Sequence, residues 1–146
     1  MRLRQLEKKD ARLMLEWMHD KSVVRYLQTD FMNKTLDDCK AFIHASNNSS
    51  EDMHLAIVDN QDIYMGTVSL KHITQETAEF AITMRTCAMG KGYASFAMAE
   101  VIRIGLEELG LREIYWYVSS ENKRAIRFYD KNGYQRSSAG ICCQGG

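Results

Sequence analysis

The segment most informative about the architecture of this chain is Met89-Gly90-Lys91-Gly92-Tyr93-Ala94. Before it, apolar and polar residues alternate over 77–84, which predicts a β-strand. After it, apolar residues recur every three or four positions over 94–109, which predicts an amphipathic helix. The first turn of a helix has unpaired N–H groups and a partial positive charge, and glycines let a ligand approach the backbone closely. The sequence therefore predicts a phosphate-binding turn at this point.

Two common phosphate loops do not match this turn. A Walker A loop needs G-x-x-x-x-G-K-[ST], but Lys91 is followed by Gly92, and Arg85 stands at the position of the first glycine. A dinucleotide fingerprint needs G-x-G-x-x-G, and Ser95 stands where its third glycine belongs. A phosphate loop of a third kind remains open, and so does a tight strand-to-helix turn that binds no ligand.

Along the rest of the chain, the hydrophobic period changes from helical to strand-like. The first third is expected to be helical, and Thr35 and Asn122 are expected N-caps. Residues 114–118 are apolar on both faces, so this strand is expected to be central and buried. Together these patterns predict an α/β (α+β) domain on a mixed sheet. The predicted helices are at 10–18, 35–46, 94–109 and 122–133, and the predicted strands at 54–58, 63–70, 77–84 and 114–118.

The composition is that of one ordinary globular domain. The chain has 146 residues, with 19 basic and 19 acidic residues and a formal net charge of zero. Nucleic-acid-binding proteins usually have a basic excess, and no apolar run approaches the ~20 residues that span a membrane. The four cysteines lack zinc-site spacing, and nothing at the N-terminus resembles a secretory signal. These features predict a cytoplasmic protein with no metal and with no nucleic-acid or membrane partner.

The glycine turn and the segment after residue 121 together resemble the GNAT superfamily of N-acetyltransferases. The acyl-CoA loop of this family reads [QR]-x-x-G-x-[GA]; Gly92 and Ala94 match it, whereas Met89 stands at the [QR] position. Residues 16–20 and 78–80 are similar to the RimJ/RimL-like branch. The resemblance implies a mostly antiparallel central sheet flanked by helices. A second family motif is matched by Asn122, Ala125, Ile126, Phe128, Tyr129, Lys131, Gly133 and Tyr134.

The resemblance also implies a ligand, acetyl-CoA, as the co-substrate. Backbone N–H groups of residues 89–94 are implied to hold the pyrophosphate of coenzyme A. Lys91 either adds charge near a phosphate or is a solvated loop lysine, and Asn122 either contacts the coenzyme or only caps its helix. Three strand residues are implied to pair through their backbone with the pantetheine amides, like an added strand, namely Ile82, Thr83 and Met84.

Acetyl transfer to an amine needs a base for the ammonium and an acid for the departing thiolate. Tyr129 matches the family tyrosine that is implied as general acid; a phenol with a pKa of about 10 protonates a thiolate with a pKa of about 8.5 at a cost of about 2 kcal/mol. The alternative makes Tyr129 a core aromatic. Glu79 is the candidate base, and its alternative is a solvated strand carboxylate. The implied acceptor is a small-molecule amine or a protein N-terminus.

The resemblance covers residues 1–136 as a single domain, and two departures leave a second function open. Met89 replaces the family's [QR] residue, and residues 137–146 lack the alternation of a further strand and end in two glycines. This tail is expected to be flexible or atypical, which leaves a sheet edge open for another segment or for a second copy in a homodimer. The departures favour the alternative of a catalytically inactive acyl-CoA-binding or sensing module.

Overall fold

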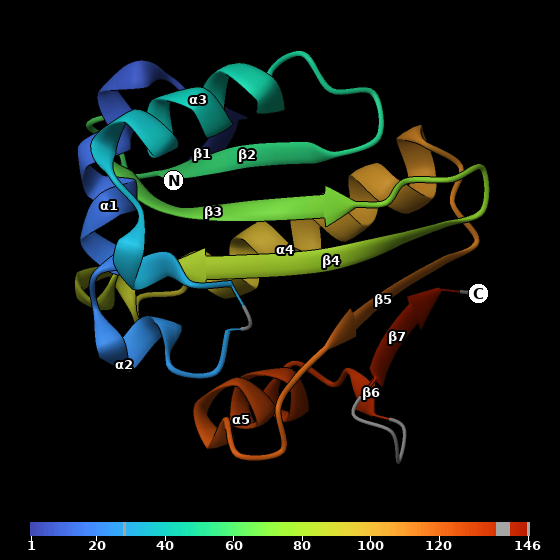
Figure 1. The fold of residues 1–146 in the computed structure, drawn as a ribbon. Helices are drawn as coiled ribbons and strands as arrows, with labels where there is room; N and C mark the ends of the chain where they lie inside the picture. Colours follow the sequence, from blue (N-terminus) through green and yellow to red (C-terminus); the bar gives the residue numbers. More distant parts are fainter. Residues whose placement is uncertain (28, 137–140, 146) are drawn as a thin grey trace.

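Figure 1 shows a computed structural model of the chain, which describes residues 1–27, 29–136 and 141–145. Its strands are β1 (Arg2–Gln5), β2 (Met53–Val58), β3 (Tyr64–Lys71), β4 (Thr77–Met84), β5 (Glu113–Tyr117), β6 (Gln135–Arg136) and β7 (Ile141–Gly145). Its α-helices are α1 (Ala11–Met18), α2 (Lys21–Val24), α3 (Leu36–Ser46), α4 (Tyr93–Arg103) and α5 (Lys123–Lys131). Shorter pieces are η1 (Lys8–Asp10), η2 (Phe31–Asn33), η3 (Thr86–Ala88) and the π-helical η4 (Ile104–Glu108).

The strands form one seven-stranded sheet in the order β1-β2-β3-β4-β5-β7-β6. All neighbours run antiparallel except β4 and β5, which are parallel. Helices α1 and α3 cover one face of the sheet, and α4 crosses the other face (Figure 1). The prediction of a mixed, mostly antiparallel α/β fold is confirmed. Within the described ranges, no helix is both long enough and apolar enough to cross a membrane.

Alternation along β2 supports two hydrophobic cores at once. Ala56 and Val58 pack with α1, α2 and α3, while Ile57 between them packs on the other face with α4. Successive side chains of a strand point to opposite faces, so one strand contributes to both layers. The core under α4 extends to Phe80 of β4 and Trp116 of β5. This second core therefore underlies the glycine turn and the strand that precedes it.

Both predicted N-caps are confirmed by their hydrogen bonds. Thr35 Oγ1 accepts from the Asp38 N–H at 3.2 Å, and the Asp38 carboxylate accepts from the Thr35 N–H at 2.8 Å. Asn122 Oδ1 accepts from the Ala125 N–H at 3.2 Å. Each cap satisfies an N–H group that has no partner within the helix, so these polar residues decide where α3 and α5 begin.

Replacing Thr35 by Ala is expected to lower the free energy of unfolding by about 1 kcal/mol, because the Asp38 N–H loses its acceptor. Urea unfolding followed by circular dichroism measures this change. Thr35→Ser, which keeps the hydroxyl, is the matched control and is expected to retain most of the stability. A serine variant as unstable as the alanine variant would show that the cap does not act through its hydroxyl.

β1 corrects the expectation that the first third of the chain is helical. It pairs antiparallel with β2, with Arg2 opposite Val58. Arg4 donates from Nη1 and Nη2 to both carboxylate oxygens of buried Asp10 at 2.8 and 2.9 Å, and from Nε to Asp62 at 2.8 Å. Hydrogen bonds from Lys9 and Arg4 lower the pKa of Asp62 to about 2. Leu3 is the single apolar residue in this strand, so tertiary pairing rather than a local pattern positions it.

The end of the sheet also differs from the prediction. β5 lies inside the sheet, but it is buried on one face only, since Trp116 is 1% exposed and Tyr117 is 60% exposed. Residues 141–145 form β7 between β5 and β6, a strand that the sequence pattern did not predict. The chain itself therefore covers the edge of β5 that was expected to be open. Residues 137–140 and 146, to which the same expectation applied, lie outside the described residues.

Candidate active site

β4 and β5 are paired at one end and diverge at the other. Their parallel register joins Thr77 to Glu113, Ala78 to Ile114 and Glu79 to Tyr115. β4 then continues over residues 80–84 without a β5 partner, and Figure 1 shows the two strands separating toward α5. We call this divergence, between residues 80–84 and 116–117, the fork. Among the described residues, no strand pairs with this edge of β4, so its N–H and C=O groups can hydrogen-bond to an extended chain laid beside them.

The other edge of β4 is held tightly by β3. Gly66 lies opposite Met84, and a Cβ at Gly66 would lie 2.5 Å from the Thr83 carbonyl oxygen and 2.7 Å from Met84 Sδ. Only glycine permits so close an approach. Ile82 is only partly buried although β4 is an interior strand. The three residues predicted to offer backbone to pantetheine thus lie where one edge is fixed and the other is free.

The predicted phosphate-binding turn joins β4 and η3 to α4. Gly90 and Gly92 have φ angles of +76° and +88°, a left-handed conformation that favours glycine. Gly92 is the N-cap of α4 and has no side chain for the N–H groups of the first turn, which lack intrahelical partners. A Cβ at either glycine would meet no atom within 4 Å. The outer surface of the turn is therefore open, and its N–H groups fit a phosphate.

The other side chains of the turn divide between surface and core. Lys91 is exposed. Met89, Tyr93 and Ala94 are partly buried and pack against the α4 core. Met89, which departs from the family motif, thus supplies apolar contact beneath the turn, while the backbone above it keeps the open geometry.

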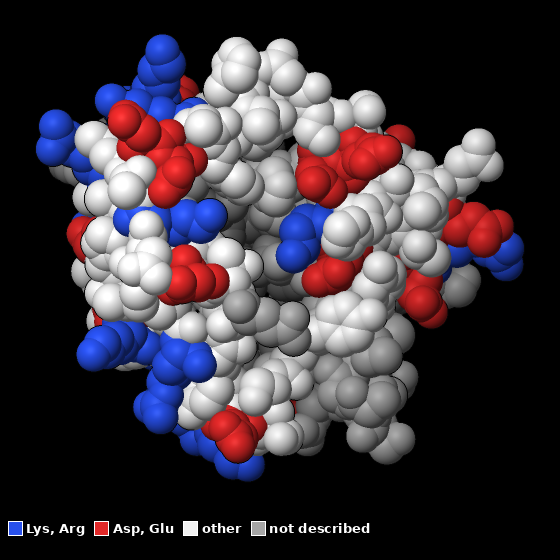
Figure 2. Space-filling model, viewed as in Figure 1, with Lys and Arg blue, Asp and Glu red and all other residues white. Residues whose placement is uncertain are grey.

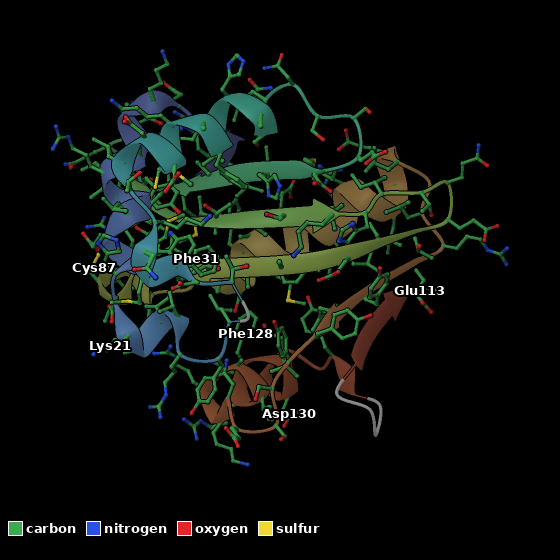
Figure 3. The ribbon with its side chains drawn as sticks, in the orientation of Figure 1. Lys21, Phe31, Cys87, Glu113, Phe128 and Asp130 are labelled. Carbon is green, nitrogen blue, oxygen red and sulfur yellow. The ribbon has the colours of Figure 1, made fainter. Side chains whose placement is uncertain are left out.

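Tyr129 lies at the fork, on the α4 side of the sheet. It is 7% exposed, and its ring centroid is 5.4 Å from that of Trp116, which follows the last β5 residue that pairs with β4. The ring centroids of Trp116 and Phe80 lie 5.8 Å apart, and Phe80 is the first residue of β4 without a partner in β5. Figure 3 shows Glu113 at the paired end of β5 and Phe128 between α5 and β4. α5 thus carries Tyr129 to the point where the strands separate.

Glu79 projects from the opposite face of the sheet, because it alternates with the core residue Phe80. Its carboxylate oxygens lie 3.6 Å from Lys71 Nζ and 3.8 Å from His72 Nε2, and its side chain is 18% exposed. The two predicted catalytic residues are therefore not in one cluster. Tyr129 and Glu79 lie at a similar position along the strands but on opposite faces of the sheet. Reactants that contact both side chains must therefore meet between β4 and β5.

α2 connects both sides of the fork, an arrangement that the sequence analysis missed. Thr86, which follows β4, donates to Asp20 Oδ2 at 2.6 Å, and Arg124 of α5 donates to the Ser22 carbonyl oxygen at 3.1 Å. Asp20 is also the N-cap of α2, and hydrogen bonds from Thr86 and Ser22 lower its pKa. The capping role of Asp20 could be predicted from its neighbours in the sequence. Its contact with Thr86 could not, because the two residues are 66 positions apart.

The face that carries Glu79 bears both signs of charge. In Figure 2, basic and acidic side chains surround a hollow near the middle of this face. Arg85, at the end of β4, pairs with Glu16 of α1 at 3.0 Å and donates to the Tyr64 carbonyl oxygen at 3.0 Å. Among the described His, Cys, Asp and Glu side chains, no group of three could hold a metal ion.

Sequence comparison matches the chain to a known family. The profile of the acetyltransferase (GNAT) domain matches residues 1–135. The chain is 27% identical over 135 residues to the uncharacterized N-acetyltransferase YnaD of Bacillus subtilis, covering 92% of this chain and 78% of that protein. It is 24% identical over 134 residues to the spermidine N(1)-acetyltransferase of Vibrio cholerae, covering 90% and 77%.

Comparison with solved structures agrees with the fold. The crystal structure of spermidine N-acetyltransferase from Vibrio cholerae in complex with CoA and spermine gives a TM-score of 0.83 at 23% identity, covering 94% of this chain and 82% of that one. A GNAT-family acetyltransferase from Bacillus anthracis gives 0.82 at 20% identity, covering 98% and 93%. At these identities the structures show the fold alone, and the profile match carries the assignment. The chain belongs to the GNAT acetyltransferase family and is an acetyl-CoA-dependent N-acetyltransferase.

Proposed function

We propose that this chain transfers acetyl directly from acetyl-CoA to a primary amine at the fork, with no acyl-enzyme step. One observation carries the proposal: the free edge of β4 at residues 80–84 leads to the open turn at residues 89–94. Ile82, Thr83 and Met84 offer backbone hydrogen bonds to a pantetheine arm laid along that edge. The N-terminus of α4 then receives the diphosphate.

The coenzyme is held mainly by backbone in this proposal. Each favourable contact with the dipole of α4 contributes roughly 0.3–1 kcal/mol. Lys91 adds a positive charge from its exposed position. Asn122 uses its Oδ1 atom as the cap of α5, so its amide N–H groups are what it offers to the coenzyme. The residues whose N–H groups form the turn are Met89, Gly90, Lys91, Gly92, Tyr93 and Ala94.

Two side chains move the protons. Bound acetyl-CoA supplies the acetyl group activated as a thioester. Glu79, directly or through a water molecule, takes the proton of the acceptor ammonium, because only a neutral nitrogen attacks. At pH 7 this deprotonation costs about 4.6 kcal/mol for a lysine-like amine and about 1 kcal/mol for an N-terminal amine, so alkyl amines depend most on the base. Tyr129 gives its phenolic proton to the sulfur as the C–S bond breaks and regains a proton from solvent.

The acceptor is proposed to be a small-molecule amine or a protein N-terminus, as the resemblance to the family implies, and the RimJ/RimL-like branch stays a prediction. Relatives from Vibrio cholerae and Escherichia coli are named for spermidine, which makes a polyamine the first compound to test. The location in the cytoplasm stays a prediction from sequence. So does the homodimer, although a related spermidine N-acetyltransferase is described as dodecameric.

The alternative function, an inactive acyl-CoA-binding or sensing module, is favoured by one observation. Met89 stands at the polar position of the family motif and packs against the core. A module of this kind keeps the free strand edge and the open turn, but it has no use for an acid at Tyr129 or a base at Glu79.

A thiol-release assay separates the two functions. The purified chain is incubated with acetyl-CoA and a panel of spermidine, butylamine, an amino sugar, an aminoglycoside and a peptide with a free N-terminus. We expect saturable thiol release with at least one amine, and the acetylated product in the mass spectrum. Isothermal titration with coenzyme A runs in parallel. Saturable binding of coenzyme A without turnover on any amine would contradict the proposed enzyme function and favour the binding module.

A further inference from the structure

Two tyrosines on β5 face away from the α4 core, beside Glu79. Tyr115 and Tyr117 alternate with buried Trp116, so both project from the face opposite the core. Their ring centroids lie 5.8 Å apart, with planes at 79°. Tyr117 is 60% exposed, a large value for an aromatic residue on an interior strand. Tyr115 is the register partner of Glu79, so their side chains are neighbours on this face.

These three side chains have the chemistry that recognises an organic cation. Two rings at a steep angle present two π faces, and an ammonium group is attracted to such faces. A carboxylate next to the rings adds a full negative charge. Burial, followed by the neighbouring Glu79 carboxylate, raises the pKa of Tyr115, which is consistent with their close approach.

We propose that Tyr115 and Tyr117, beside Glu79, form a subsite for a second, protonated ammonium group of the acceptor, and that the enzyme therefore prefers diamines and polyamines to monoamines. The inference rests on the proposed function, because the subsite borders the fork at which transfer takes place. The two rings hold the ammonium group that does not react, while Glu79 faces the one that does. The rings line β5 from Tyr115, its last residue paired with β4, toward the diverging end, so a long amine bound there extends along the fork.

The protein's own cations compete for the same carboxylate. Lys71 Nζ lies 3.6 Å and His72 Nε2 3.8 Å from Glu79, and the Lys71 side chain is 34% exposed. At 3.6 Å the Lys71 contact is longer than a hydrogen-bonded ion pair, and the flexible side chain can turn into solvent. Removing this cation as Lys71→Met is therefore expected to strengthen polyamine binding about two- to threefold.

The decisive experiment compares spermidine, a polyamine, with butylamine, a monoamine, in wild type and in Tyr117→Leu. The measured quantity is the ratio of kcat/KM for the two amines. We expect Tyr117→Leu to lower this ratio about three- to fivefold, because a cation–π contact is lost. Tyr117→Phe, which keeps the ring, is expected to retain the ratio. Phe42→Leu, at an exposed aromatic of α3, is the matched control and leaves the ratio unchanged.

Direct binding of spermidine to the coenzyme A complex, followed by isothermal titration, separates this inference from the proposed function. Binding that weakens in Tyr117→Leu supports the subsite even when no amine in the panel is acetylated, an outcome that defeats the proposed function alone. Equal losses for spermidine and butylamine, or no binding of spermidine at all, would overturn the subsite. A spermidine-to-butylamine ratio that Tyr117→Leu leaves unchanged would overturn it too.

Discussion

Replacing Tyr129 by Phe is expected to lower turnover about 10²–10³-fold, the usual contribution of a positioned general acid. The phenylalanine ring keeps the contact with Trp116, whose centroid lies 5.4 Å from that of Tyr129, so the loss is confined to the hydroxyl. The dissociation constant of coenzyme A is expected to change less than about threefold. Steady-state thiol release measures the first quantity, and isothermal titration the second.

Tyr134→Phe is the matched control for this prediction. The Tyr134 ring lies 5.3 Å from the same Trp116, and burial raises its pKa. It loses the same hydroxyl beside the same indole but has no role in proton transfer, so turnover is expected to stay at the wild-type level. Full turnover in Tyr129→Phe would remove this residue from the mechanism. Equal losses in the two variants would point to packing around Trp116 instead of acid catalysis.

Replacing Gly92 by Val is expected to weaken coenzyme A binding about thirtyfold, equivalent to about 2 kcal/mol of anion stabilisation at a partly buried helix N-terminus. Gly92 has a φ of +88°, and its Cβ would project into the open space above the turn. A branched side chain there meets the diphosphate and strains the backbone by roughly 1–2 kcal/mol. Isothermal titration with coenzyme A, at a temperature well below unfolding, measures the change.

Gly110→Val separates strain from ligand binding. Gly110 has a φ of +70° and, like Gly92, no atom within 4 Å of a built Cβ. It lies beyond the far end of α4 and η4, about 24 Å along the helical segment from the turn. Both variants are expected to lose similar amounts of stability in thermal unfolding, while only Gly92→Val loses affinity. Equal affinity losses would mean that the turn is not where the diphosphate binds.

The elements that were predicted correctly are those whose signals are local. Thr35 and Asn122 cap their helices through residues three positions away, so a short sequence window contains both partners. The helix predicted over 94–109 is found as α4 followed by the π-helical η4. A Cβ at Gly105 would lie 2.7 Å from Ile114 Cδ1, so packing against β5 shapes this end of the helix. The sequence pattern predicts the helix, but it does not show the contact with β5 that shapes the end of the helix.

β1 and β7 show why other elements were missed. Neither has the alternation that predicts a strand, and each is placed by a partner far away in the chain. Arg2 pairs opposite Val58, and Tyr117 opposite Ile141. Such segments form strands because a neighbouring strand has a free edge to pair with. Their own residues contain no information about that neighbour.

The turn at residues 89–94 could be predicted from the residues alone, because a strand, two glycines and a helix start are adjacent in the chain and the N–H groups of a first helical turn point outward by local geometry. The rest of the site depends on contacts between elements that are far apart in the chain. The divergence of β4 from β5 depends on the register between strands that are separated by a whole helix. Tyr129 and Glu79 lie on opposite sides of the sheet, because Glu79 alternates with the core residue Phe80 whereas Tyr129 of α5 packs into the α4 core. The sequence pattern of one strand shows which of its residues share a face. Where two strands stop pairing can be seen only in the folded structure.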